Sequence, residues 1–320
     1  MRSRQVQVAR GDRGDWMSHL PEKLWEVPLW NLAIPGSHDT MTDRLDECSR
    51  VVRSESLVLR ALDRCFPCVT RPCVKRWATT QTWDILDQLD AGIRFLDLRI
   101  AHKTHDAGNT FYFAHGIYSQ QTVKDTVTCV AQWLWEHPKE VVVIACSAFD
   151  GMDQEQHLEL IHLLRRVFER RLCPKTETPS LSLCWRYGYQ VILSYDDGAA
   201  EPYCELWPSI DYWWADTPDP KDLISYLEGR KQSGRPTEAF FVAGMNLTED
   251  FRYILQHPCQ TMRTMTQRAY AFLLDWIRKQ HPGPTRTGLN IICADFVGDS
   301  EFIHIVIALN QGNLRGATLD

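Results

Sequence analysis

The 320-residue sequence lacks any long apolar run, which argues against a membrane-spanning helix. The longest strongly apolar run, Val141 to Cys146, has the length of a strand, whereas a spanning helix needs about 20 apolar residues. The first residues, Met1 to Asp15, contain four arginines but no apolar segment, so they lack the pattern of a secretory signal. No glycine follows Met1, so myristoylation is not expected. We therefore expect a cytoplasmic protein without a transmembrane segment.

A basic excess is also missing. The chain has 35 Lys and Arg against 41 Asp and Glu, for a formal net charge of −6. Nucleic-acid-binding proteins typically show a basic excess or a basic stripe, so no nucleic-acid partner is expected. The negative charge also disfavours general attraction to anionic lipid. Any membrane contact must therefore come from a local patch or from apolar side chains.

Internal repeats, low-complexity tracts and linker-like shifts of composition are absent. With 44% hydrophobic and 24% charged residues, the chain has the composition of an ordinary globular protein. We expect a flexible lead-in over residues 1–15, one folded domain over 16–312 and a tail over 313–320. The protein is expected to be a monomer.

The eleven cysteines form no clear disulfide or metal pattern. An odd number in a chain without a secretory signal indicates reduced thiols. Cys48, Cys65, Cys68 and Cys73 lie close together, but they lack the spacing of a zinc module and have no nearby histidine partner. Whether these four bind a metal stays open, and no cofactor is otherwise expected.

Short apolar runs alternate with helical patterns along most of the chain. The runs are dense in Val, Ile, Leu and Phe, which is typical of strands buried on both faces. Strands are expected at 30–34, 94–100, 110–115, 141–147, 190–195, 210–215, 239–245 and 290–295. Helices are expected at 55–62, 82–89, 123–136, 155–171, 222–231, 262–280 and 301–309.

Eight strands that alternate with helices predict an α/β fold, a (β/α)8 TIM barrel. Two stretches depart from an ideal barrel. Residues 41–79 form a long mixture of polar residues and cysteines, and residues 196–209 show no helical pattern between two strands. We therefore expect a distorted barrel in a single domain.

Polar side chains with catalytic chemistry end four of the expected strands. They are His38, Asp39, Asp97, Arg99, His115 and Asp295. Each alone has an ordinary explanation, such as a helix cap or a buried ion pair. Barrel enzymes, however, carry their active sites at the carboxyl ends of the strands, so six such residues on one rim indicate an active site.

The residue types suit cleavage of a phosphodiester. Two imidazoles on opposite sides of a substrate can take a proton from a nucleophile and give one to a leaving group. An arginine between them can bind a phosphate and stabilise its developing charge. A carboxylate behind the base fixes its tautomer. This chemistry needs no metal.

Three segments resemble the X domain of phosphatidylinositol-specific phospholipase C (PI-PLC). They are Pro35-Gly-Ser-His-Asp-Thr, Gly92-Ile-Arg-Phe-Leu-Asp-Leu-Arg and Phe113-Ala-His-Gly. The likeness runs from about Asp15 to Leu309 and is closer to the vertebrate X-domain-containing proteins, which consist of little more than this catalytic barrel. The resemblance implies a hydrolase of phosphoinositide lipids that contacts the membrane transiently at its surface.

The resemblance also implies roles for single residues. His38 matches the general base that deprotonates the inositol 2-hydroxyl, and His115 matches the general acid that protonates the diacylglycerol oxygen. Arg99 matches the phosphate-binding arginine, and Asp295 the carboxylate that supports the base. The remaining two, Asp39 and Asp97, match acids that orient groups around the phosphate. The implied products are diacylglycerol and a cyclic inositol phosphate.

One departure from the calcium-dependent members of the family is important. Those enzymes carry calcium ligands where this chain has Asp39, Asp97 and Arg99. A calcium ion near a guanidinium is unfavourable, because like charges about 4 Å apart repel by about 4 kcal/mol at an effective dielectric constant of 20. The resemblance and this departure together predict a metal-independent enzyme.

Two further candidates and two alternative functions remain. Tyr195, at the end of the fifth expected strand, is a candidate substrate-binding residue for inositol hydroxyls. The aromatic run Tyr212-Trp-Trp is expected in the core rather than at a lipid-contacting rim. The alternatives are a metal-dependent glycerophosphodiester phosphodiesterase, which Arg99 disfavours, and a lipid-binding or scaffolding protein with little or no catalysis.

Overall fold

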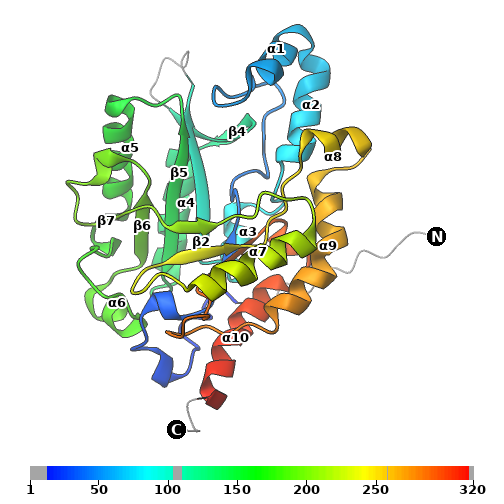
Figure 1. The fold of residues 1–320 in the computed structure, drawn as a ribbon. Helices are drawn as coiled ribbons and strands as arrows, with labels where there is room; N and C mark the ends of the chain where they lie inside the picture. The colour runs from blue at the N-terminus through cyan, green and yellow to red at the C-terminus, as the bar shows by residue number, and fades with distance from the viewer. Residues whose placement is uncertain (1–12, 104–109, 258, 317–320) are drawn as a thin grey trace.

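Eight parallel strands form a curled sheet at the centre of the molecule, in the order β7-β6-β5-β2-β1-β10-β9-β8 (Figure 1). The computed structural model describes residues 13–103, 110–257 and 259–316. Within these ranges β7 and β8 stand at the two ends of the order and do not pair, so the barrel is open on one side. The prediction of a distorted α/β barrel in a single domain is confirmed.

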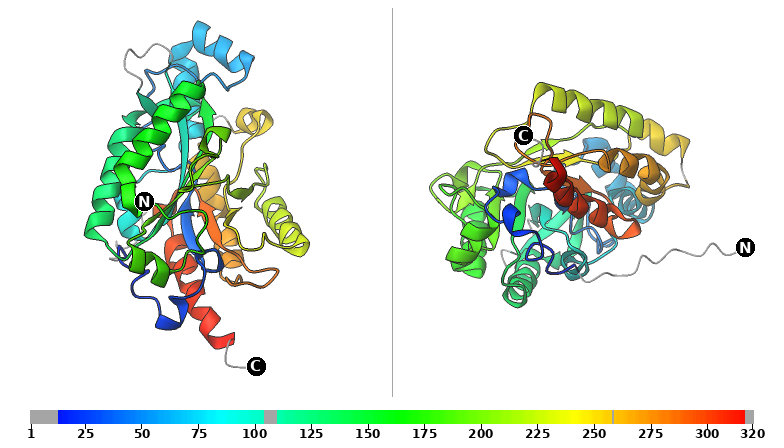
Figure 2. Two further views of the ribbon diagram at one scale, coloured as in Figure 1. Left: turned by 90° about the vertical axis from the view of Figure 1, so that its left-hand side faces the viewer. Right: turned by 90° about the horizontal axis from the view of Figure 1, so that it is seen from below.

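The strands in the described residues are β1 (Ile34–Ser37), β2 (Phe95–His102), β3 (Phe111–His115), β4 (Ile117–Thr122), β5 (Val142–Asp150), β6 (Val191–Tyr195), β7 (Leu206–Trp207), β8 (Asp211–Trp213), β9 (Phe241–Gly244) and β10 (Ile291–Ala294). The α-helices are α1 (Leu57–Cys65), α2 (Pro67–Ala78), α3 (Ile85–Ala91), α4 (Val123–Glu136), α5 (Gln154–Phe168), α6 (Leu181–Tyr187), α7 (Pro220–Ser233), α8 (Phe251–Gln256), α9 (Met262–Ile277) and α10 (Phe302–Gly316). The helices surround the sheet, with α4 beside α5 and α9 in contact with both α7 and α10 (Figure 2).

Each barrel strand separates two apolar layers, because successive side chains of a strand point to opposite faces. In β2, Leu96 and Leu98 pack outward in the layer shared with the helices. Phe95 packs in the inner layer. Asp97 and Arg99 follow Phe95 at intervals of two residues and therefore share its inward face. This alternation places the Asp97 carboxylate and the Arg99 guanidinium on the inner face, toward the carboxyl end of the barrel.

The segment before β1 fills the amino end of the barrel. Trp16, Met17, Leu29 and Trp30 are buried there in the inner layer. The prediction of a strand at 30–34 was wrong, because residues 29–31 form a 3-10 turn and the strand begins only at Ile34. The apolar density of this segment reflects its place in the barrel interior rather than strand pairing.

The prediction that 110–115 is a barrel strand was also wrong. β3 pairs antiparallel with β2 and continues into β4, so both strands lie outside the eight-strand order. An antiparallel neighbour needs no helical crossover, so this pairing does not require the helix that joins two parallel strands. The missing barrel strand is instead β7, within the stretch 196–209 that showed no helical pattern and for which no strand was predicted.

The long segment 41–79 contains two helices where one was expected. Ser56 caps α1 by accepting a hydrogen bond from the backbone of Leu59. Pro67 begins α2 at a position where a helix needs no amide hydrogen bond. Phe66, between them, has a non-helical backbone and turns the chain. α6 was not expected, whereas α4 has the predicted bounds.

Residues 1–12 of the expected lead-in and residues 317–320 of the expected tail lie outside the described residues. The carbonyl of Gly14 already contacts the barrel, and α10 continues to Gly316. Among the residues that the structure describes, no helix is long and apolar enough to cross a bilayer.

A fully buried ion pair joins the barrel to the segment that fills its amino end. Arg94 donates to Glu140 through Nε (3.0 Å) and Nη2 (2.8 Å). Glu140 also accepts from the backbone amides of Met17 (3.3 Å) and Ser18 (3.1 Å). Nη2 of Arg94 donates to the carbonyl of Gly14 (2.6 Å). Removing one partner would leave a buried charge without compensation.

Glu140→Ala is expected to lower the free energy of unfolding by about 3–5 kcal/mol, because it strands the Arg94 guanidinium in the interior. Denaturant unfolding would measure this loss. Asp275→Ala removes an exposed ion pair with Lys279 and serves as control, with an expected change below about 1 kcal/mol. Similar losses in both variants would contradict the assignment.

Candidate active site

The turn after β1 brings His38 and Asp39 to the carboxyl end of the barrel. The amide of His38 donates to the carbonyl of Ala294 in β10 (3.1 Å), which extends the strand pairing. Asp39 adopts a left-handed backbone with φ of 42°, a conformation that aspartate tolerates better than most residues. Its amide donates to Oδ2 of Asp97 (3.1 Å). This strained turn aims the Asp39 carboxylate into the site.

The Asp39 carboxylate lies at the centre of the candidate site. Its Oδ2 is 3.4 Å from Nε2 of His38 and 3.3 Å from Nε2 of His115. Its Oδ1 forms an ion pair with Nε of Arg99. Burial raises the pKa of Asp39, but Arg99, His115 and His38 outweigh burial, so the net shift is downward. One buried anion therefore contacts both imidazoles and the guanidinium.

Hydrogen bonds identify the tautomer of His38. Nδ1 lies 2.8 Å from Oδ1 of Asp295, and because a carboxylate accepts, Nδ1 carries the proton. Nε2 lies 3.0 Å from Nη2 of Arg99, which only donates. The lone pair of Nε2 therefore points into the site, where it accepts from Arg99, and Asp295 lies behind the ring. This is the arrangement of an oriented base.

The surrounding carboxylates make His38 a strong base. Burial lowers its pKa, but Asp39 and Asp295 outweigh burial and raise the pKa of His38 to about 9. Burial also raises the pKa of Asp295. The contact between Nε2 and Arg99 belongs to the neutral imidazole, which dominates above that pKa.

His115 comes from a different structural unit. It ends β3, outside the barrel, and its Nδ1 donates to the carbonyl of Ala78 at the end of α2 (2.7 Å). The negative end of the α2 dipole lies at this ring. The ring centroids of His38 and His115 are 6.3 Å apart, with Asp39 between them. The two imidazoles thus reach the site from opposite sides.

Two other groups hold the site but were not foreseen. The amide of Gln81 donates to the carbonyls of His38 and Ala294, both at 2.9 Å. The hydroxyl of Thr80 contacts the carbonyls of His38 (3.1 Å) and Asp39 (3.2 Å). Both follow α2, between the irregular segment expected at 41–79 and the helix expected at 82–89. No local pattern marks them, because their partners lie more than forty positions away.

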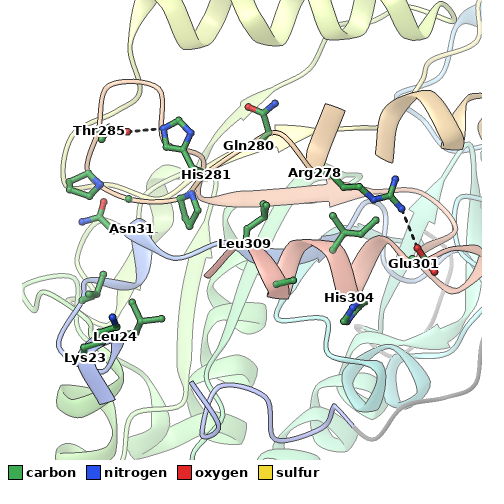
Figure 3. Close-up of a pocket in the computed structure, with 16 residues that line it drawn as sticks. Lys23, Leu24, Asn31, Arg278, Gln280, His281, Thr285, Glu301, His304 and Leu309 are labelled. Carbon is green, nitrogen blue, oxygen red and sulfur yellow. Dashed lines mark hydrogen bonds and ion pairs between the residues drawn. The ribbon is translucent and has the colours of Figure 1, made fainter. Parts of the chain in front are cut away.

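Two cavities lie next to this cluster, and a third lies at the opposite end of the barrel. A polar cavity of about 350 Å³ is lined by His38, Asp97, Arg99, Ser147, Ser194, Asp196, Tyr212, Trp214 and Asn246, among others. An apolar pocket of about 580 Å³ is lined by His115, Glu55, Leu59, Leu62, Phe66, Val69, Trp77, Glu249 and Ile254, among others. A third cavity of about 1210 Å³ lies at the amino end of the barrel, and two pairs of its lining residues, Arg278 with Glu301 and His281 with Thr285, bond to each other (Figure 3).

The structure brings six of the seven predicted site residues together and leaves Tyr195 apart. Tyr195 is buried in the outer layer, where its hydroxyl bonds to Nδ1 of His157 (2.8 Å). Successive side chains of β6 point to opposite faces of the strand. Ile192 packs inward and Ser194, two residues on, lines the polar cavity, so the next residue, Tyr195, points outward and not into the site as predicted. Tyr195 therefore faces α5 rather than the candidate site.

The aromatic run of β8 divides between core and site. Trp213 is buried in the outer layer, as expected. Tyr212 and Trp214 instead line the polar cavity, and Trp214 is about half exposed. The Tyr212 hydroxyl bonds to Oδ1 of Asn246 (2.9 Å). The expectation of a core position thus holds for one residue of the three.

A group with metal-ligand geometry exists within the site. His38, Asp39 and Asp97 each offer a ligand atom within 4.8 Å of the others. Arg99 already contacts all three of these residues, so a cation there would meet a guanidinium. In the described part of the chain, the four cysteines from Cys48 to Cys73 form no such group and remain free thiols.

Comparison with known proteins finds relatives over most of the chain. Residues 74–171 match the family described as PI-PLC X 1. The chain is 56% identical over 299 residues to PI-PLC X domain-containing protein 1 of Danio rerio, covering 93% of this chain and 96% of that protein. It is 45% identical over 303 residues to the protein of the same name from Homo sapiens, covering 94% of both.

Solved structures of bacterial enzymes share the fold. The phosphatidylinositol-specific phospholipase C of Listeria monocytogenes superposes with a TM-score of 0.63 at 19% identity, covering 93% of this chain and 99% of that one. A variant of the Staphylococcus aureus enzyme superposes with a TM-score of 0.65 at 15% identity, covering 92% and 97%. With its close relatives matched over nearly their whole length, the chain belongs to the PI-PLC X domain-containing protein family.

Proposed function

We propose that this protein is a metal-independent phosphoric diester hydrolase of the phospholipase C type. It cleaves a phosphoinositide into diacylglycerol and a cyclic inositol phosphate, acting as a cytoplasmic monomer that contacts the membrane transiently. The observation that carries the proposal is the division of the two imidazoles between two cavities. His38 lines the polar cavity, whereas His115 lines the apolar pocket.

This division favours one role for each histidine. A sugar headgroup suits the polar cavity, where hydroxyl, amide and carboxylate side chains can bond to it. Its hydroxyl would lie next to His38, whose Nε2 lone pair is oriented by Asp295. The diacylglycerol leaving group suits the apolar pocket beside His115. His38 is therefore the proposed base and His115 the proposed acid.

Arg99 links substrate binding to activation of the base. Its guanidinium contacts both Asp39 and Nε2 of His38. A phosphate attracts a guanidinium more strongly than a neutral imidazole does, because both partners are charged. Binding of the phosphodiester would therefore draw Arg99 from His38 and free the lone pair for the hydroxyl proton. Asp97 and Asp39 hold the guanidinium in place.

His38→Ala is expected to lower the turnover of phosphatidylinositol in mixed micelles by about 10² to 10⁴, the usual contribution of one acid–base group. His162→Ala, an exposed histidine on α5, is the matched control and should keep the wild-type rate. Equal rates for His38→Ala and wild type would remove catalysis and favour a lipid-binding role.

Chelation tests the metal-independent mechanism. Because Arg99 supplies the positive charge at the phosphate, the rate in EDTA is expected to equal the rate without it. The same assay with added Ca²⁺ should show no stimulation. A loss on chelation that Ca²⁺ or another divalent ion restores would overturn the arginine-based mechanism and favour a metal at His38, Asp39 and Asp97.

The pH dependence of kcat/KM tests the role of Asp295. His38 acts as a base only when deprotonated, so the wild-type value should rise with pH toward the raised pKa of about 9. Asp295→Asn removes one carboxylate that raises this pKa, so the rise should shift to lower pH, with a lower plateau because the ring loses its orienting carboxylate. Asp275→Asn on α9 is the control. An unchanged profile, or a shift to higher pH, would contradict the assignment.

A further inference from the structure

A cavity beside α1 concentrates positive charge on a protein that is negative as a whole. This cavity, here called the arginine pocket, has a volume of about 650 Å³. Its charged lining comprises six cations and one carboxylate, namely Arg50, Arg53, Arg60, Arg64, Arg71, Lys103 and Asp63. The whole chain, by contrast, has a net charge of −6. None of these residues belongs to the candidate active site.

Four of the five arginines have no carboxylate partner among the described residues. Asp63 is buried and takes Nε of Arg71 at 2.6 Å. Among the described residues no ion pair involves Arg50, Arg53, Arg60 or Arg64, and all four are exposed. Several guanidinium groups around one cavity repel one another. Their planar donor groups match a phosphate, which would relieve that repulsion.

The backbone beneath the arginine pocket is held firmly. The buried carboxylate of Asp150 accepts from the amides of Arg53 (3.0 Å) and Ser54 (2.8 Å). The amide of Val52 donates to the carbonyl of Gly116 (2.9 Å), the residue that follows His115. The arginine pocket is therefore built onto the same hairpin of strands that carries the proposed acid.

Helix α1 forms one wall of the arginine pocket. Arg60 and Arg64 lie four positions apart in α1, so they occupy one face of the helix. Leu59 and Leu62, on the other side, line the apolar pocket beside His115. α1 therefore separates a cationic cavity from an apolar one at the rim of the barrel, where Figure 1 shows α1 and α2 standing above β4.

Exposed apolar side chains on α1, on α2 and at the turn between them point to the occupant. Leu57, Val58, Phe66 and Val69 are exposed by 79%, 71%, 60% and 67%. A soluble anion makes no use of such side chains. The surface of an anionic bilayer offers phosphates and an apolar layer within a few ångströms, which matches cations and apolar residues on one amphipathic element.

We propose that the arginine pocket binds the phosphate-bearing headgroup of an anionic phospholipid as a non-catalytic site, and so attaches the α1–α2 rim to the membrane. Bound in this way, the protein would hold the apolar pocket and His115 at the lipid surface. The local charge reconciles membrane contact with the overall negative charge. This site acts in binding alone, so it can be tested whether or not the chain proves catalytic.

Vesicle co-sedimentation tests the proposal with phosphatidylcholine vesicles, alone or mixed with phosphatidylserine. Arg60→Gln with Arg64→Gln is expected to weaken binding to the mixed vesicles by about 10- to 30-fold, from the usual contribution of a basic residue near an anionic membrane. Binding to phosphatidylcholine alone should not change. Both arginines are exposed, so folding should be retained, and circular dichroism would verify this.

The matched control changes the same net charge elsewhere. Arg166→Gln with Arg170→Gln removes two exposed arginines near the end of α5 and should bind mixed vesicles like wild type. Equal losses in both double variants, or no loss in either, would overturn the proposal. All measurements can be repeated in His38→Ala, so a failure of binding is distinguished from a failure of catalysis.

A separate arm distinguishes a lipid headgroup from a free anion. Inorganic phosphate is titrated into the protein without vesicles and followed by calorimetry. Little or no saturable binding is expected, because the site uses the apolar side chains as well. Tight binding of phosphate to wild type that is lost in Arg60→Gln with Arg64→Gln would overturn the lipid assignment and indicate a site for a soluble anion.

Discussion

The contacts of the Asp39 carboxylate are the interaction on which the candidate site depends. A guanidinium and two imidazoles converge on this one buried anion. Without it, Arg99 and a positive charge on His38 would repel each other across a few ångströms. The unusual backbone of Asp39 and the acceptor supplied by Asp97 are the structural cost of placing that anion correctly.

The proposed base and acid belong to different parts of the fold. His38 follows a barrel strand and is held from the end of the neighbouring strand β10, through the carbonyl of Ala294 and the carboxylate of Asp295. His115 ends a hairpin outside the barrel and is held by the last carbonyl of α2. The segment that contains α1 and α2 therefore belongs to the site, although it lies outside the regular barrel. The long segment between β1 and α3 thus positions His115 through the carbonyl of Ala78.

The same segment separates three environments at one rim. A polar cavity lies at His38, an apolar pocket lies at His115, and the arginine pocket lies on the far side of α1. A phospholipid combines the same three features: a polar headgroup, an apolar body and a negatively charged surface around it. The order of these cavities across the rim thus matches the chemistry of the proposed substrate in its membrane.

Local sequence patterns were enough to identify the barrel and most of the site. Strand periodicity places Asp97 and Arg99 on one face, and the ends of parallel strands meet at one rim, so their grouping with His38, Asp39 and Asp295 followed from the chain alone. His115 was grouped with them on the prediction of a parallel barrel strand, whereas β3 is antiparallel and lies outside the barrel. Which face of β6 points inward was not visible, since both faces are apolar, and Tyr195 was therefore misplaced. Trp30 was wrongly predicted to begin a strand for a related reason. The apolar segment that fills the amino end of the barrel has the same composition as a buried strand.

The amino-acid sequence by itself determined the alternation of strands and helices, and with it the residues available for chemistry at the strand ends. Only the tertiary structure decided how those residues meet: that β3 turns back antiparallel, that Gln81 and Ala78 hold the two histidines, and that α1 divides charge from apolar surface. The physical reason is distance along the chain. Periodicity acts over a few residues, whereas these contacts join segments tens to hundreds of positions apart and form only when the whole core packs.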